Sequence, residues 1–418
     1  MRKQLSLFLA AVMLFGCLGL TAYAEEPAQG RFTSYDQVNA AITIIPGTDT
    51  QAELGYLDGV TEILTVDGLQ FKDLNGNGML DKYEDWRLDV DERIRDLYDQ
   101  MTLEEKAGLF YHVNTCGNPQ GVDFADSRYM FSTESTVPDD NATFPAKSMW
   151  YYINELQITT HLDNTNGTPE QQVTYHNAMQ AIAEDTRLGI PVVISNDRQY
   201  NAWGGMIDTA HDAFGAANDL ELSEKLWTIY SLESRAVGIH VTFEPYANEI
   251  GAQYGENPEY IAAIVHEEIR GLEENGLASC TKHWIGRGGD SAFGKARSVA
   301  QNFENWMVGW KAALSAGSEW VMTNCGGTGI SNTVDVKWDK ATMNYLRNEI
   351  DLGDHKGFDG VVVTDWWALG GGPSNPGRMS GITAEGVDLG QQTIGWLYNE
   401  ALANGTDMFG SGSMIRDY

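Results

Sequence analysis

One stretch of the sequence joins a carboxylate and an aromatic ring to a strand that can hold both in place. Residues 357–366 read GFDGVVVTDW, so a glycine-rich turn leads into β-branched residues, and Asp365 emerges beside Trp366 at the end of the run. Such a run is typical of a buried strand. A carboxylate can form a covalent glycosyl ester, and an indole ring can pack on the C–H face of a pyranose. The stretch therefore suits sugar chemistry, although a strand-end aspartate can also simply cap the following loop.

Other apolar runs in the sequence also end in polar residues. Asp197 follows one run, Lys282 and His283 lie near the end of another, and Asn324 follows a third. The carboxyl ends of the strands of a parallel barrel converge on one face, where active sites are built. We therefore expect these side chains to meet Asp365 on that face. A Lys-His pair at a strand end is also common as an ordinary surface or supporting pair, and the pattern alone leaves both interpretations open.

A second group of oxygen-bearing residues lies earlier in the chain. Residues 73–84 match the twelve-residue calcium-binding loop position by position, with Gly78 at the sharp turn. The expected ligands are Asp73, Asn75, Asn77, the Met79 carbonyl, Asp81 and Glu84. Calcium here would be structural, because the loop lies away from the strand ends, and we expect catalysis to need no cofactor. The alternative is a calcium-free turn held by Asx hydrogen bonds.

The elements that must position the strand-end residues follow from the hydrophobic pattern. Short apolar runs alternate with longer amphipathic ones from about residue 108, which predicts βα units around a parallel sheet. The predicted strands are residues 107–113, 150–162, 191–197, 240–247, 278–284, 319–325, 360–366 and 405–409. The predicted helices are residues 168–188, 222–237, 258–275, 301–315 and 338–350. Eight strands with intervening helices predict a (β/α)8 TIM-type barrel, while residues 114–149 are long enough for a lid or an extra strand.

The region before the barrel divides into a leader and an extension. Residues 1–24 have the basic start, apolar stretch and Ala-Tyr-Ala end of a signal peptide, which predicts a secreted or periplasmic protein. Lipid attachment at Cys17 is a competing interpretation that also implies export. Residues 25–100 are expected to form a short β-rich N-terminal extension that ends in a helix over 89–100. Residues 101–418 would form the barrel, which begins with a capping box of Thr102 and Glu105.

Composition excludes several classes of partner and site. The chain has 27 basic and 59 acidic residues, a formal net charge of −32, so nucleic acid and anionic membranes are poor partners. Beyond the leader, Cys116, Cys280 and Cys325 show no paired spacing. Neither a disulfide framework nor a zinc site is indicated, and we expect these cysteines to be small core residues.

Several ordered motifs together resemble family 3 glycoside hydrolases. They are residues 101–106, 187–191, 282–284 and 357–366, with a calcium-type lead-in over 71–87. The resemblance covers most of residues 71–407 and implies that the barrel is the N-terminal, catalytic domain of that family. It also implies residue roles, and these are stated next.

By this resemblance, Asp365 is the nucleophile of a double displacement that retains the β configuration, and Trp366 borders the sugar site. Asp197 would accept hydrogen bonds from sugar hydroxyls, and Lys282 and His283 would donate to others. Lys282 would also help to keep Asp365 ionised. Arg235, Glu244 and Asp359 are instead expected to be structural, and the tryptophans at 306, 310 and 320 to be packing residues.

The sequence departs from the family pattern in two ways. Residues 246–255 contain no arginine where the family commonly has one that reaches the sugar, and Asn324 begins a segment where tyrosine is frequent. The acid/base, about 5 to 5.5 Å from the nucleophile in retaining enzymes, comes in most of the family from a second α/β sandwich domain, which we expect to be absent here. A barrel-only branch, acting on N-acetylglucosaminides, uses an Asp-His pair, but residues 286–295 offer Asp290 and Ser291 without a histidine.

The expected function is a retaining exo-β-glycosidase of the β-glucosidase or β-xylosidase type, with β-glucoside or β-xyloside oligosaccharides as substrates. The alternative is a carbohydrate-binding protein on a catalytically impaired glycosidase barrel. The chain end and the missing arginine favour the alternative. Asp365, Lys282 and His283 favour the enzyme.

Overall fold

The core of the molecule is one sheet of eight parallel strands. The computed structural model describes residues 30–114, 126–134, 147–163, 167–197, 211–247, 254–255, 257–285, 299–324, 329–330, 336–366, 383–384, 387–388 and 394–411. Within these residues the strand order of the sheet is β11-β10-β9-β8-β7-β6-β5-β14. The strands are β5 (Tyr111–Asn114), β6 (Thr160–Asp163), β7 (Val193–Asn196), β8 (Val241–Thr242), β9 (Ala278–Trp284), β10 (Trp320–Thr323), β11 (Val361–Thr364) and β14 (Phe409–Ser411).

The sheet closes on itself between its first and last strands. β14 pairs in parallel with β5, with Phe409 opposite Tyr111. On its other side, Met408 forms a parallel bridge to Val363 of β11, and its carbonyl accepts from the Thr364 amide at 2.9 Å. The (β/α)8 barrel predicted from the sequence is therefore confirmed.

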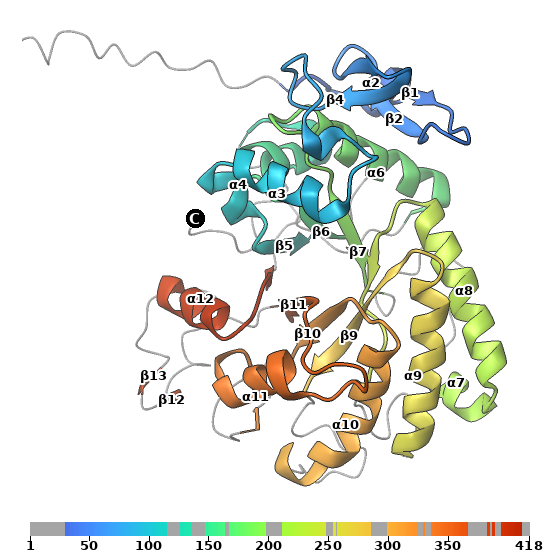
Figure 1. Cartoon of the computed structure of the whole chain (residues 1–418), viewed down its shortest axis with the longest axis vertical. Helices are drawn as coiled ribbons and strands as arrows, with labels where there is room; N and C mark the ends of the chain where they lie inside the picture. The colour runs from blue at the N-terminus through green and yellow to red at the C-terminus, as the bar shows by residue number, and fades with distance from the viewer. Residues whose placement is uncertain are drawn as a thin grey trace, which may run out of the picture.

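Helices surround the barrel (Figure 1). They are α6 (Pro169–Glu184), α8 (Leu220–Ala236), α9 (Pro258–Glu273), α10 (Val299–Ser315), α11 (Lys340–Asn344) and α12 (Ile394–Ala403). The Thr168 side chain accepts from the Gln171 amide at the start of α6, and Asn257 caps α9 in the same way. In α9, a Cβ on Gly271 would lie 2.8 Å from the carbonyl oxygen of Glu224 in α8, so a glycine is required where these two helices pack.

Shorter elements complete the described part of the barrel domain. They are α4 (Leu103–Gly108), α5 (Arg128–Phe131), α7 (His211–Ala217), η2 (Tyr151–Glu155), η3 (Val336–Trp338), η4 (Tyr345–Glu349) and the two-residue strands β12 (Thr383–Ala384) and β13 (Val387–Asp388). α4 begins at the predicted capping box, in which the Thr102 hydroxyl accepts from the Glu105 amide and the Glu105 carboxylate accepts from the Thr102 amide.

The N-terminal segment contains two hairpins and packs on one end of the barrel domain, at the top of Figure 1. Its elements are α2 (Tyr35–Ala41), β1 (Ile42–Ile45), β2 (Leu54–Leu57), β3 (Glu62–Val66), β4 (Leu69–Asp73), η1 (Lys82–Glu84) and α3 (Val90–Gln100). Glu184 of α6 fastens the segment to the barrel. Its carboxylate accepts from the Leu57 amide at 2.9 Å and the Thr61 hydroxyl at 2.6 Å, and it pairs with Lys72.

An ion pair joins two of the segments that carry the family resemblance. Arg187 donates from Nε to Glu105 at 2.9 Å and from Nη2 to the Gln100 carbonyl at 2.9 Å. Burial raises the pKa of Glu105, but Arg187 and the Thr102 amide outweigh it, so the pKa ends below its ordinary value. The motifs at 101–106 and 187–191 therefore meet in a structural contact that holds α4 against the end of α6.

The structure corrects several elements of the sequence prediction, including the strand predicted over 405–409, which is β14 over Phe409–Ser411. The strand predicted over 107–113 begins only at Tyr111, because the capped helix α4 continues to Gly108. The first part of the strand predicted over 150–162 is helical over Tyr151–Glu155, and pairing begins at Thr160. The β-rich extension also contains a helix, α2, for which Ser34 provides the cap.

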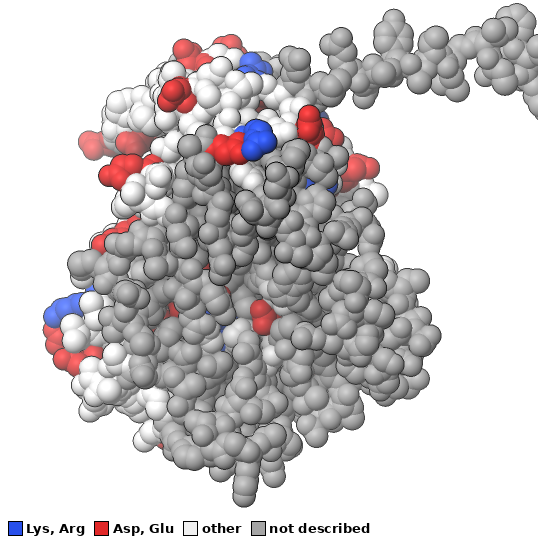
Figure 2. Space-filling model, turned by 180° about the vertical axis from the view of Figure 1, so that it is seen from behind, with Lys and Arg blue, Asp and Glu red and all other residues white. Residues whose placement is uncertain are grey.

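Buried apolar side chains lie both inside the barrel and between the barrel and its helices. The interior cluster comprises Leu162, Val241, Phe243, Cys280, Trp320, Met322 and Val363. Trp306 and Trp310 belong to the layer between strands and helices, which confirms their packing role. On the face shown in Figure 2, acidic side chains gather over the upper part of the molecule. Among the described helices, none has the length and apolarity needed to cross a membrane.

Candidate active site

Lys282 lies in the barrel mouth against a carboxylate. β9 carries this lysine near its carboxyl end, and Nζ donates to Oδ1 of Asp197 at 3.0 Å. Asp197 directly follows β7, so two of the predicted strand-end residues meet across the mouth. The Lys282 side chain is only 1% exposed, whereas that of Asp197 is 15% exposed. The carboxylate is thus the member of the pair that a ligand in the mouth could reach.

The surroundings of Lys282 keep it charged. Burial by itself lowers the pKa of Lys282, because it removes water from the ammonium group. Attraction to Asp197, and to Tyr246 and Glu244, outweighs burial, so the pKa of Lys282 stands well above its ordinary value. Nζ also lies 4.5 Å from the centroid of the Tyr246 ring. Glu244, which the sequence suggested was structural, is fully buried and adds to the negative field at Lys282.

His283 faces the carboxylate proposed as nucleophile. Its Nε2 lies 3.8 Å from Oδ2 of Asp365, which is close enough for attraction when the imidazole is charged but too far for a direct hydrogen bond. The Asp365 amide donates to the Thr323 carbonyl at 3.0 Å, and its Oδ1 accepts from the Trp366 amide at 2.6 Å. These two bonds fix the backbone and the carboxylate of Asp365 at the end of β11.

Trp366 turns into the barrel mouth. Its ring lies 5.1 Å from the rings of both His112 and Phe243, and Nε1 donates to Oδ1 of Asn114 at 2.5 Å. The ring remains partly exposed and packs on the interior cluster. Trp366 therefore forms part of the floor of the site beside Asp365.

The buried thiol of Cys280 shows that the charged groups surround one region. Burial raises the pKa of this thiol above its ordinary range, while Lys282 lowers it and Asp197 and Asp365 raise it further. All three charged groups are thus near enough to influence a single atom in the barrel interior. The structure brings together the five sequence-predicted site residues, and the cysteine is a core residue as expected.

The structure adds partners that sequence reasoning did not identify. The resemblance implied that Lys282 supports the charge of Asp365, but it did not identify Asp197 as a direct hydrogen-bond partner of Lys282. Asn114 and Tyr246 were also missed. Asn114 ends β5 and so carries the same strand-end signal as the residues that were predicted. Arg235, by contrast, is structural as expected, since it donates to the Ile239 carbonyl at 2.9 Å.

Several sequence predictions fall outside the described residues. They concern the leader, Cys116, Cys325, Asp290 and Ser291, most of the segment 246–255 in which no arginine occurs, and much of the region 114–149. Within the last region, the described residues form the short helix α5 rather than a strand.

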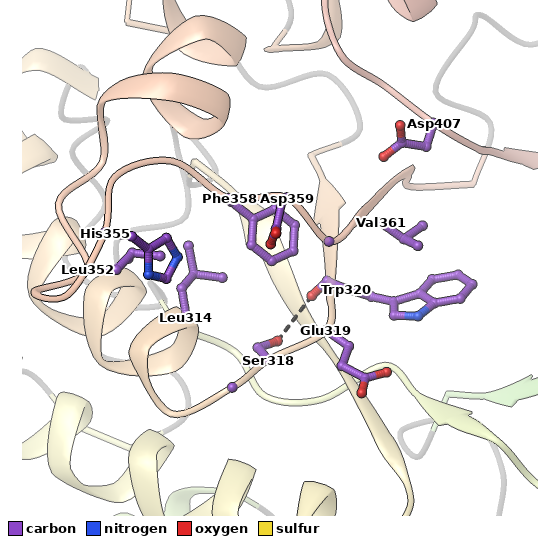
Figure 3. A pocket seen from close by; sticks show the side chains of 12 residues that line it. Leu314, Ser318, Glu319, Trp320, Leu352, His355, Phe358, Asp359, Val361 and Asp407 are labelled. Atoms are coloured by element: carbon purple, nitrogen blue, oxygen red, sulfur yellow. Dashed lines mark hydrogen bonds between the residues drawn. The ribbon is translucent and has the colours of Figure 1, made fainter. Parts of the chain in front are cut away.

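Two pockets open at the opposite end of the barrel. One of about 630 Å³ is lined by residues that precede or begin β10 and β11, including Glu319, Trp320 and Asp359 (Figure 3). The other, of about 350 Å³, also contains Glu319 and Trp320. Figure 3 shows the Ser318 hydroxyl donating to the Trp320 carbonyl at 3.1 Å. Because active sites of this fold lie at the carboxyl ends of the strands, neither pocket is a candidate active site.

The calcium-type loop is closed by its own hydrogen bonds. The Asp73 carboxylate accepts from the Asn77 and Gly78 amides at 3.1 and 2.8 Å, which is an Asx-type arrangement. Both oxygens of Glu84 accept from backbone amides: Oε1 from Leu74 at 2.7 Å and Oε2 from Asp81 at 3.0 Å. In this arrangement Glu84 does not fit the role of a bidentate ligand, because its oxygens already face N–H groups.

No three His, Cys, Asp or Glu side chains in the described part of the chain are arranged to hold a metal ion. Calcium binding at residues 73–84 therefore stays a prediction.

Comparisons with known proteins identify the family to which the barrel is similar. Residues 153–382 match the glycosyl hydrolase family 3 N-terminal domain. A periplasmic beta-glucosidase/beta-xylosidase of Dickeya chrysanthemi is 30% identical over 352 residues, which cover 73% of this chain and 50% of that protein. Beta-glucosidase C of Emericella nidulans is 28% identical over 66% of this chain and 46% of its own length. The chain thus spans about half the length of these relatives.

Solved structures share the fold. An exo-1,3/1,4-beta-glucanase from a Pseudoalteromonas species, in its Q683A form, superposes with a TM-score of 0.55 at 18% identity, over 77% of this chain and 48% of that chain. A family 3 beta-N-acetylglucosaminidase from a Paenibacillus species gives a TM-score of 0.53 at 20% identity, over 75% of this chain and 55% of that chain.

Proposed function

Since the chain belongs to glycoside hydrolase family 3, we propose that it acts as a retaining exo-β-glycosidase on terminal β-D-glucosyl or related residues. The observation that carries the proposal is the convergence of Asp365, His283, Lys282, Asp197 and Trp366 at the carboxyl ends of the barrel strands. The barrel mouth thus contains a carboxylate, a permanent cation, an imidazole and an indole. These are groups that the binding and cleavage of a glycosyl unit require.

In the proposed reaction, an Asp365 oxygen attacks the anomeric carbon as the glycosidic C–O bond breaks. The leaving oxygen takes a proton from a general acid, and the sugar stays attached to Asp365 as an ester. Water then attacks the same carbon, gives up a proton to the group that acted as acid, and releases the sugar with its β configuration retained. We assign the acid/base to none of the described residues.

The other residues are proposed to bind the sugar. The partly exposed Asp197 carboxylate would accept from a hydroxyl, while Lys282 holds that carboxylate in place. His283, beside Asp365, would exchange hydrogen bonds with a hydroxyl next to the reacting carbon. The Trp366 ring would contact the apolar face of the pyranose. The names of the Dickeya and Emericella relatives support glucosides and xylosides as the substrate class.

An aryl glycoside with a very good leaving group tests the proposal, because its glycosylation step needs no acid. We expect a burst of phenol from 2,4-dinitrophenyl β-glucoside or β-xyloside, and a sugar adduct that peptide mass spectrometry maps to Asp365. Asp365→Asn should abolish both. Asp359→Asn is a matched control, because this acid lies near the other end of the same strand, in the opposite pocket.

The result separates the two candidate functions. If no adduct forms with the gluco, xylo or galacto compounds while sugar binding is measurable by calorimetry, the protein is the carbohydrate-binding alternative. An adduct on another carboxylate would refute the role of Asp365.

We also propose that the chain is exported, from the leader-like residues 1–24 and the periplasmic name of the Dickeya relative. Cell fractionation followed by N-terminal sequencing should find the protein outside the cytoplasm and beginning near Glu25. A product that keeps residues 1–24 and stays in the cytoplasm would contradict export.

A further inference from the structure

The indole ring of Trp366 is held by residues from three other strands or their ends. Nε1 donates to Oδ1 of Asn114 at 2.5 Å, and the ring lies 5.1 Å from both the His112 and Phe243 rings. Asn114 ends β5, which is separated from β11 by β14. The hydrogen bond therefore passes over β14, where a Cβ on Gly410 would lie 2.8 Å from the Trp366 ring. Glycine at this position lets the ring lie in the mouth.

We infer that Asn114 is a positioning residue, which sets the orientation of the Trp366 ring at the sugar site and is supported from below by His112. This role rests on the proposed function, because ring orientation affects turnover only if the sugar contacts the ring. The family match covers residues 153–382 and does not include Asn114.

Among the contacts that the ring makes with the described residues, the hydrogen bond to Asn114 defines its direction. The contacts with His112 and Phe243 are packing contacts, at interplanar angles of 68° and 52°, and packing of this kind tolerates rotation of the ring. The indole N–H is a donor that needs one acceptor along its own axis, so the Asn114 carbonyl selects a single ring orientation. The same requirement fixes the amide of Asn114 with its oxygen toward Trp366.

His112 provides an uncharged support beneath the ring. His112 Nε2 shares a hydrogen bond of 2.6 Å with the Ser195 hydroxyl, which also lies 3.3 Å from the His161 carbonyl oxygen. Burial, with a contribution from His161, lowers the pKa of His112 to about 3. The imidazole is therefore neutral at any pH at which the enzyme is expected to work, and the floor of the site does not change charge.

The first test detects the hydrogen bond between Trp366 and Asn114 by NMR, without any substrate. In protein labelled with ¹⁵N at the tryptophan indoles, the Trp366 resonance is identified by its loss in Trp366→Phe. Asn114→Leu, which removes the acceptor at similar volume, should shift that resonance upfield and speed its exchange with solvent. Asn114→Asp keeps an acceptor and should leave the indole proton bonded. An unchanged resonance in Asn114→Leu would overturn the inference.

The second test is a double-mutant cycle on hydrolysis of 2,4-dinitrophenyl β-glucoside. A ring that contacts the sugar before and during reaction contributes uniform binding, so Asn114→Leu should raise KM more than it lowers kcat. We expect kcat/KM to fall by about 10- to 100-fold, the usual effect of misplacing a group that positions substrate. In the Trp366→Phe background, which has no indole N–H, Asn114→Leu should have almost no further effect.

A control variant separates positioning from general loss of stability. Asn275→Leu removes an amide that donates to the Gly271 carbonyl at 2.9 Å, just after α9 and far from the barrel mouth. It should lower the melting temperature without changing KM. If Asn114→Leu behaves like Asn275→Leu, or if its effect persists in the Trp366→Phe background, Asn114 does not act through Trp366.

Failure of the inference and failure of the proposed function give different results. If the protein shows no turnover and forms no adduct, the proposed function fails, and the indole resonance still decides whether Asn114 orients Trp366. If turnover is present but the cycle is additive, only the inference fails.

Discussion

Replacement of Lys282 and of Asp197 should have unequal effects on stability, and the inequality follows from the charges around the lysine. Lys282→Met removes the cation, so Asp197 and the fully buried Glu244 lose the positive charge that balances them. Asp197→Asn removes one negative charge but leaves Lys282 facing Glu244 and Tyr246, with an amide oxygen in the place of the carboxylate.

The magnitudes follow from these two situations. Removing one member of a buried ion pair costs about 3–5 kcal/mol, and Lys282→Met should lie in that range because two carboxylates lose their counter-ion. Asp197→Asn should cost only about 1–3 kcal/mol, the range for weakening one hydrogen bond to a charged group. The double variant should be less destabilised than the sum of the two single variants by at least about 1 kcal/mol.

Urea denaturation at pH 7, followed by tryptophan fluorescence, measures all three free energies of unfolding. The pKa of Lys282 is raised in the folded protein, so its contribution is fully present below the unfolded pKa of about 10.4 and is lost only as the pH rises through the folded value. The contribution of Lys282 to wild-type stability should therefore be constant between pH 5 and 9. An Asp197→Asn variant less stable than Lys282→Met, or an additive double variant, would refute the charge balance described for this site.

Three further predictions concern parts of the molecule away from the site. Burial raises the pKa of Glu273 to about 7, although hydrogen bonds from Ser279 oppose it, so the folded protein should lose stability as the pH rises from about 4.3 to 7. At pH 8 the free energy of unfolding of Glu273→Gln should then exceed that of the wild type by about 2–3 kcal/mol. Equal urea midpoints of the two proteins at pH 8 would contradict this. Chelation with EDTA should lower the melting temperature of the wild type but not of Glu84→Gln, whereas an unchanged wild-type melt would argue against bound calcium. Arg347 donates to the carbonyls of Gly405, Phe358 and Gly360 around β11. Arg347→Met should therefore lower the free energy of unfolding by about 3–5 kcal/mol in urea titrations, and Arg347→Lys by less, whereas equal losses in the two variants would contradict this.

Calcium binding would require Glu84 to turn, because both of its oxygens accept from backbone amides in the described loop. This carboxylate is 4% exposed, and burial raises its pKa although backbone amides of Asp81, Leu74 and Asn75 lower it. A divalent cation would relieve the burial of a charge in the loop.

The sequence predicts the barrel because its strands are encoded locally. The run Val361–Thr364 is β-branched throughout and appears as the strand β11. Local signals fail where two of them overlap. Residues 107–110 are apolar enough to resemble the start of a strand. The helix α4, whose start is fixed by Thr102 and Glu105, nevertheless continues through residues 107 and 108. The π-helical segment Tyr151–Glu155 was mistaken for a strand because its aromatic and β-branched residues favour both structures.

The site was predictable as a set of residues but not as a set of contacts. Strand-end position identifies Asp197, Lys282 and Asp365 one by one, and it would have identified Asn114 as well. Strand-end position cannot predict which of these residues are in contact. Asn114 and Trp366 are 252 positions apart and meet only because β14 closes the barrel between their strands. That meeting also requires the β14 register, which sets Gly410 opposite His112 and leaves room for the indole above it. Closure and register are properties of the whole sheet, so the contacts that orient the site appear only once the eight strands are assembled.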